Sequence, residues 1–129
     1  MLLDVRFLND VSSVNSFDYI DNVEFYGGDT QVIYLQLVNA SVDKASAGFS
    51  PAGRRYMPAA LSNVSVTFRN LDDSKVVTRF ATQPFALDPS IWSIPILASD
   101  TFSGTVSVNL VLIEGAKVYH VNNIIMRVL

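Results

Sequence analysis

Apolar and polar residues alternate along most of this chain, and this period of two constrains the fold more than any other feature. Val64, Val66 and Phe68 are each separated by one polar residue, and the same spacing runs from Val106 to Leu112. Because successive side chains of a strand point to opposite faces, such a pattern gives each strand one apolar face. No stretch has the apolar stripe of an amphipathic helix. The pattern therefore predicts an all-β protein.

Turn residues separate the alternating stretches at short intervals. Gly27 and Gly28 precede one stretch, and Asp72-Asp73 and Gly115 each lie between two others. Short turns of this kind join antiparallel strands. We expect eight strands, over residues 2–8, 17–26, 31–38, 63–69, 75–82, 91–97, 105–113 and 117–128, and a break of the second at Asp21-Asn22 remains open. This arrangement is typical of an immunoglobulin-like antiparallel β-sandwich of about seven to nine strands. We expect it to occupy residues 1–129 as a single domain.

The stretch from Gln31 to Val38 is apolar on both faces for most of its length. A strand with this pattern is expected at the centre of a sheet that is covered on both sides. Proline has no N–H to donate to a neighbouring strand, so it is tolerated only at sheet edges and corners. We therefore expect Pro84, Pro89 and Pro95 at such positions.

Residues 39–62 do not fit a compact sandwich. They contain two glycines, two prolines and many small residues, and they have no regular period. Loops beyond about 12–15 residues without secondary structure are uncommon in compact domains unless they have a function. The segment is expected to be one long loop or arm. A loop folded over its own sandwich, an arm that reaches a neighbouring subunit and a flexible flap all remain open.

Candidate interface residues come from this segment and from the apolar last residues of the sequence. Arginine and tyrosine are enriched at the centres of protein interfaces, and adjacent apolar side chains add surface that can be buried there. The last six residues are apolar apart from one arginine, which is the pattern of a covered end. The candidate interface residues are Phe49, Arg54, Arg55, Tyr56, Met57 and Leu129.

Residues suited to catalysis are scarce. The chain has no cysteine and one histidine, His120, which lies in a predicted strand and is expected to be a structural or surface residue. Asp18, Asp21 and Asp29 lack the spacing of a calcium-binding loop. Trp92 could stack on a sugar, but its place in an alternating strand favours the core. We therefore expect no enzymatic activity, no metal and no cofactor.

Half of the residues are hydrophobic and only 16% are charged, whereas roughly 25% charged residues is usual. The basic residues form no stripe, and no apolar run approaches the roughly 18 residues of a membrane-spanning helix, so neither nucleic acid nor membrane is an expected partner. Residues 1–43 have a net charge of −6 and residues 44–129 a net charge of +3. This unevenness is either accidental or complementary between identical subunits. We expect other subunits to cover the apolar surface that exceeds one core.

Several pieces occur in a characteristic order. They are a Gly-Asp turn within Phe25–Asp29, the strand at 31–38, the sequence Arg55–Ala60 before a second strand, a corner at Asp88–Trp92 and a final hairpin opened by Gly104. In this order, over residues 23–128, the chain resembles the small immunoglobulin-like domains of tailed-bacteriophage virion proteins. The N-terminal domain of the baseplate upper protein family has such a pattern.

The resemblance implies a non-enzymatic virion structural protein that assembles in multiple symmetric copies, in the tail, baseplate, neck or fibre attachment. Its partners would be other virion proteins and copies of itself, as a homo-oligomer within a larger assembly in the virion. A capsid decoration (cement) protein and a carbohydrate- or receptor-binding module are the alternatives.

Overall fold

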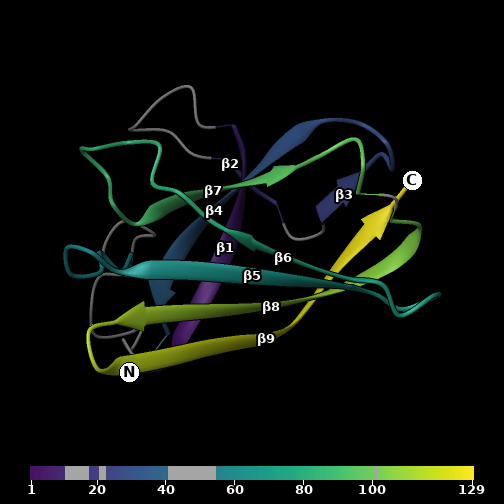
Figure 1. Cartoon of the computed structure of the whole chain (residues 1–129). Helices are drawn as coiled ribbons and strands as arrows, with labels where there is room; N and C mark the ends of the chain where they lie inside the picture. The colour runs from purple at the N-terminus through teal and green to yellow at the C-terminus, as the bar shows by residue number, and fades with distance from the viewer. Residues whose placement is uncertain (11–17, 21–22, 41–54, 101) are drawn as a thin grey trace.

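The computed structural model describes residues 1–10, 18–20, 23–40, 55–100 and 102–129, and Figure 1 shows their arrangement. Strands and connections form this part of the chain, with no helix in it, so the all-β prediction is confirmed. Accordingly, the described ranges contain no helix that could cross a membrane. The strands are β1 (Leu3–Asp10), β2 (Asp18–Ile20), β3 (Val23–Phe25), β4 (Gln31–Asn39), β5 (Asn63–Asn70), β6 (Val76–Phe80), β7 (Ile91–Ile96), β8 (Gly104–Glu114) and β9 (Lys117–Val128).

These strands form two sheets. One sheet has four strands in the order β2-β1-β4-β7, and the other has five in the order β3-β9-β8-β5-β6. Neighbours are antiparallel except for β3 and β9, which pair in parallel. The sheets lie as two layers (Figure 1). The arrangement is consistent with the predicted β-sandwich.

Alternate side chains of both sheets meet in one shared core. Leu35 and Leu37 of β4 point into it from the four-stranded sheet, and Val66 and Phe68 of β5 point into it from the five-stranded sheet. Trp92 belongs to the same core and is 2% exposed, so its predicted position is confirmed. Burying a large apolar side chain is worth roughly 1.5–3 kcal/mol. The apolar side chains that the alternation places on one face of each strand therefore hold the two sheets together.

The stretch predicted over residues 17–26 contains two short strands, β2 and β3, which lie in different sheets. β2 pairs with β1, whereas β3 pairs with β9. Val23 and Phe25 are buried in the shared core, and the Phe25 ring lies 6.3 Å from the Phe102 ring in an edge-to-face contact. The core contacts of β3 are therefore made from the five-stranded sheet. The division into two strands agrees with the alternative of a break at Asp21-Asn22, whereas their places in different sheets were not predicted.

The strand predicted over residues 75–82 changes sheets near its end. The Ala81 N–H still donates to the Val64 carbonyl of β5 at 2.9 Å. Thr82, however, exchanges two backbone hydrogen bonds with Ser93 of β7, at 3.0 and 2.7 Å. The chain thus passes from the edge of the five-stranded sheet to the edge of the four-stranded sheet and covers part of the second edge.

The predicted positions of the prolines are confirmed. Pro84 and Pro89 lie in the connection between β6 and β7, and Pro95 lies on β7, the edge strand of the four-stranded sheet. The central position predicted for residues 31–38 is also confirmed, because β4 lies between β1 and β7. Its second half is buried on both faces, whereas Val32 in its first half is exposed.

Candidate protein–protein interface

Arg55 and Tyr56 lie beside the end of β4. Arg55 forms an isolated antiparallel bridge with Val38, and the Tyr56 N–H donates to the Leu37 carbonyl at 2.8 Å. The Leu37 N–H donates in turn to the carbonyl of Ser90, the residue before β7. The two residues therefore continue the sheet next to β4, beyond the first residue of β7.

The Arg55 side chain is anchored by a buried polar network. Its Nη1 lies 3.4 Å from Oδ2 of Asp88. The Asp88 Oδ1 accepts hydrogen bonds from the Ser90 N–H at 3.2 Å and the Ser90 hydroxyl at 2.5 Å. Gln36 Nε2 then donates to the Ser90 hydroxyl at 3.1 Å. Asp88, Ser90 and Gln36 are buried, and buried polar groups need such partners. The network fixes residue 55 to the corner before β7.

The Tyr56 side chain reaches the other sheet. Its hydroxyl donates a hydrogen bond to the carboxylate of Glu114 at the end of β8. Burial of the ring, together with that hydrogen bond and the negative charge of Glu114, raises the pKa of Tyr56 to about 12. These interactions favour the neutral phenol. Tyr56 therefore connects the 39–62 segment to both sheets of its own subunit.

The other four candidate residues differ in what the structure says of them. Met57 and Leu129 are half exposed, so their side chains are available to a partner. Phe49 and Arg54 lie outside the described residues. The contacts of Arg55 and Tyr56 favour a self-packed arrangement for the described end of the 39–62 segment, and an interface role for the six residues stays a prediction.

We define the outer face of each sheet as the side away from the shared core. On the outer face of the four-stranded sheet, Leu8, Gln36, Val38 and Ile91 are only 0–4% exposed. None of them belongs to the shared core. Since they are buried in a single copy of the chain, the chain itself covers this part of the face. The apolar surplus of β4 is thus used within the subunit rather than left for a neighbour.

The outer face of the five-stranded sheet is open. Five of its apolar side chains are 41–70% exposed, namely Val76, Phe80, Ile113, Val118 and Ile125. Ile113 and Val118 face each other across β8 and β9. Most of the positions between them are hydroxyl or amide residues, such as Thr67, Thr78 and Asn109. Such an open face is the described surface best suited to a partner, because exposed apolar patches often mark protein contacts.

Sequence reasoning missed this outer face. The period-two pattern assigns each strand one apolar face and says nothing of apolar residues on the opposite face. The available signal was the presence of valine, isoleucine and phenylalanine at positions such as Val76, Phe80 and Ile125, where the alternation calls for a polar side chain.

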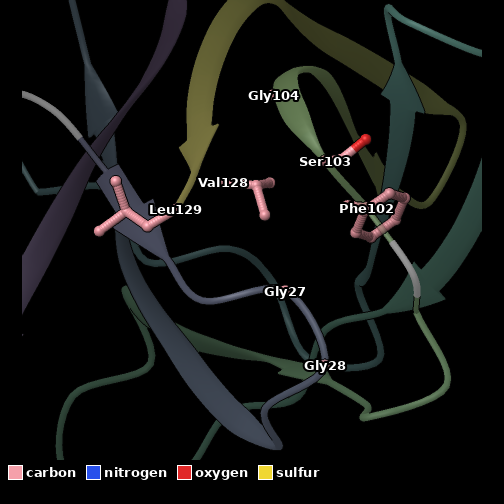
Figure 2. A pocket seen from close by; sticks show the side chains of 7 residues that line it. All are labelled: Gly27, Gly28, Phe102, Ser103, Gly104, Val128 and Leu129. Atoms are coloured by element: carbon pink, nitrogen blue, oxygen red, sulfur yellow. The ribbon is translucent and has the colours of Figure 1, made fainter.

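A hollow of about 440 Å³ lies at one end of the sandwich, between the Gly27-Gly28 turn and residues 102–104 (Figure 2). Val128 and Leu129 complete its lining. A Cβ atom on Gly27 would lie 2.7 Å from the Phe102 carbonyl oxygen, so glycine is needed for this close approach. No side chain that lines the hollow is charged at neutral pH. It offers shape and backbone groups and has no acid–base pair for catalysis.

His120 is exposed and lines a second hollow, of about 260 Å³, that also includes Asp4. In the part of the chain that the structure describes, no group of three histidine, cysteine, aspartate or glutamate residues could hold a metal ion. Of the three aspartates considered in the sequence, Asp21 lies outside the described residues. Comparison with protein families, with curated proteins and with solved structures found no match to this chain.

Proposed function

We propose that the two sheets form an immunoglobulin-like sandwich. The pairing of β4 with β1 and β7 in one sheet, and of β5, β8 and β9 in the other, supports this proposal. An immunoglobulin-like domain distributes its A, B and E strands and its C, F and G strands in that way. The parallel pair of β3 and β9 fits a first strand that is divided between the two sheets.

On this scaffold, the chain acts as a non-enzymatic virion structural protein of a tailed bacteriophage and assembles in multiple symmetric copies. The open outer face of the five-stranded sheet is the observation that carries the proposal. Its valine, isoleucine and phenylalanine side chains are exposed in a single copy, and an assembly that buries them gains roughly 25 cal/mol for each Å² of apolar surface. The order of the sequence pieces resembles that of phage virion domains, and this resemblance supports placing the chain in the virion.

Two alternatives make different use of this surface. A capsid decoration protein would use the same open face, and it would differ from the proposed role only in its location in the particle. A carbohydrate-binding module depends on exposed aromatic rings. Trp92, the residue considered for stacking on a sugar, is buried in the core and offers no such surface.

Immunogold electron microscopy of phage particles tests the proposal, with antibodies raised against the purified chain and particles from the strain that encodes it. We expect label at the tail, baseplate, neck or fibre attachment, repeated with the symmetry of that station. Label spread over the capsid would identify a decoration protein. Absence of label from intact and gently opened particles would contradict a virion role.

A further inference from the structure

β6 is an open edge of the five-stranded sheet. It pairs with β5 on one side, and in the described chain no strand pairs with its other side. Its three outward side chains, those of Val76, Thr78 and Phe80, are exposed. The edge strand β7 differs, because Thr82 bonds to it and Pro95 lies within it. Proline and a covering segment are devices that protect an edge from pairing. β6 has neither.

The hydrogen bonds of β6 show which backbone groups face solvent. The Asn70 N–H donates to the Lys75 carbonyl, and the Ala81 N–H donates to the Val64 carbonyl. In an antiparallel pair every second residue bonds to the partner strand. The N–H and C=O groups of Val76, Thr78 and Phe80 therefore point away from β5, along the open edge.

The open edge carries little charge to repel a second copy. Arg79 is the one charged residue of β6, and its side chain points toward the interior side of the sheet, where its Nη2 lies 2.5 Å from Oδ1 of Asp100. Asp100 is buried, and its second oxygen accepts the Leu97 N–H at 2.9 Å. An inward-pointing charge often guards an edge strand, but here the aspartate neutralises it.

We infer that two copies of this chain pair through β6 in antiparallel orientation, about a two-fold axis at Thr78. This register places Thr78 opposite Thr78 of the second copy, and Val76 opposite Phe80 on either side. Apolar pairs and threonine pairs are both favourable across antiparallel strands. Each outward residue finds a backbone partner, with about six new hydrogen bonds. The outer faces of the two five-stranded sheets then become one continuous surface.

The outward residues of β6 are self-complementary in this register, which is what a two-fold interface requires. On the inner side, Val77 lies opposite Arg79 of the second copy. A register shifted by one residue would place Phe80 opposite Val77 and Arg79 opposite Thr78. Each pair would then join an outward residue of one copy with an inward residue of the other. The inference deepens the proposed assembly role by naming one contact surface, and it rests on that role for its place in the virion. It can be tested on the purified chain without particles.

Single-cysteine variants test the pairing, because the natural chain has no cysteine. Thr78→Cys places two thiols on the axis, at about 5.5 Å between Cα atoms, within disulfide reach. Thr67→Cys is the matched control. Thr67 is the neighbour of Thr78 on β5, and the two hydroxyl oxygens are 3.2 Å apart, so each variant loses the same contact. Across the axis the two copies of residue 67 would be about 14 Å apart.

Under mild oxidation we expect a covalent dimer of Thr78→Cys and at least tenfold less of Thr67→Cys. Equal yields, or no dimer from Thr78→Cys, would overturn the inference. Thr78→Pro gives a second test by sedimentation, because the N–H that it removes faces solvent in the single copy. We expect a folded monomer at concentrations where the natural chain dimerises. A dimer of this variant, or a natural chain that stays monomeric, would overturn β6 pairing and leave the virion role to be decided by immunogold labelling.

Discussion

The outer faces of the two sheets have the same alternating pattern but differ in solvent exposure. On the four-stranded sheet, Val38 and Ile91 are buried although they point away from the shared core. On the five-stranded sheet, Val118 and Ile125 occupy equivalent outward positions and are half exposed. The first face is covered by its own chain, and a polar network secures the corner beside it. The second is left open.

This difference explains where the excess of hydrophobic residues lies in the structure. A chain that is half hydrophobic with 16% charged residues has more apolar side chains than one sandwich core requires. Part of the surplus forms a second buried layer on the four-stranded sheet. The remainder lies on the open face and on the edge strand β6, which are the surfaces that we assign to assembly.

The largest expected difference between the two outer faces is in the stability of two isoleucine variants, one on each face. Ile91→Ala should lower the free energy of unfolding by about 2–4 kcal/mol, because it leaves a cavity in a buried layer. Ile125→Ala should change it by less than about 0.5 kcal/mol, since this side chain is exposed. Urea denaturation of the two variants at a concentration where the chain is monomeric measures both values. Similar losses from the two substitutions would show that the two faces are not covered differently.

The polar network gives the next largest effect. Asp88→Ala removes the acceptor of Ser90 and the ionic partner of Arg55, and should cost about 2 kcal/mol of unfolding free energy. Asp29→Ala is the control, because Asp29 is exposed in a turn and should cost less than about 0.5 kcal/mol. Thermal unfolding of the two proteins side by side provides the measurement. An Asp88 variant as stable as the control would mean that the network does not hold the corner before β7.

Tyr56 gives a smaller effect that depends on pH. Tyr56→Phe loses the hydrogen bond to Glu114 and should cost about 1 kcal/mol at pH 7. The pKa of Tyr56 is about 12 in the folded chain, against an ordinary value of 10.0. The folded state then holds its proton more tightly than the unfolded state, so this stabilisation is complete below pH 10 and is lost as the pH rises toward 12.

The advantage of the natural chain over Tyr56→Phe should therefore shrink steadily between pH 10 and pH 12. Denaturation curves at stepwise increasing pH measure it. Tyr26→Phe serves as the control for the loss of a phenol group, because Tyr26 is exposed. A constant difference between the natural chain and Tyr56→Phe over this pH range would contradict the role given to the phenol.

Local hydrophobic patterns were enough to predict the all-β class and the core position of Trp92, from alternation, and the central place of residues 31–38, from apolar residues on both faces. They could not predict that residues 17–26 divide between two sheets, because Val23 and Phe25 are placed by pairing with Met126 and Val128, about a hundred residues away. The alternation also could not distinguish a covered outer face from an open one. That distinction depends on which distant segment lies over a strand, and Ile91 and Ile125 look alike in the sequence.

The central claim is that the open side of the molecule, and the β6 edge in particular, is where copies meet. Amide hydrogen exchange followed by NMR at increasing protein concentration tests it most directly. We predict that the N–H groups of Val76, Thr78 and Phe80 exchange quickly in dilute solution and become protected as the concentration rises. The Ser93 N–H of β7, already bonded to Thr82 at 2.7 Å, should keep constant protection. Exchange at the three β6 residues that is independent of concentration, while the chain self-associates, would contradict the account.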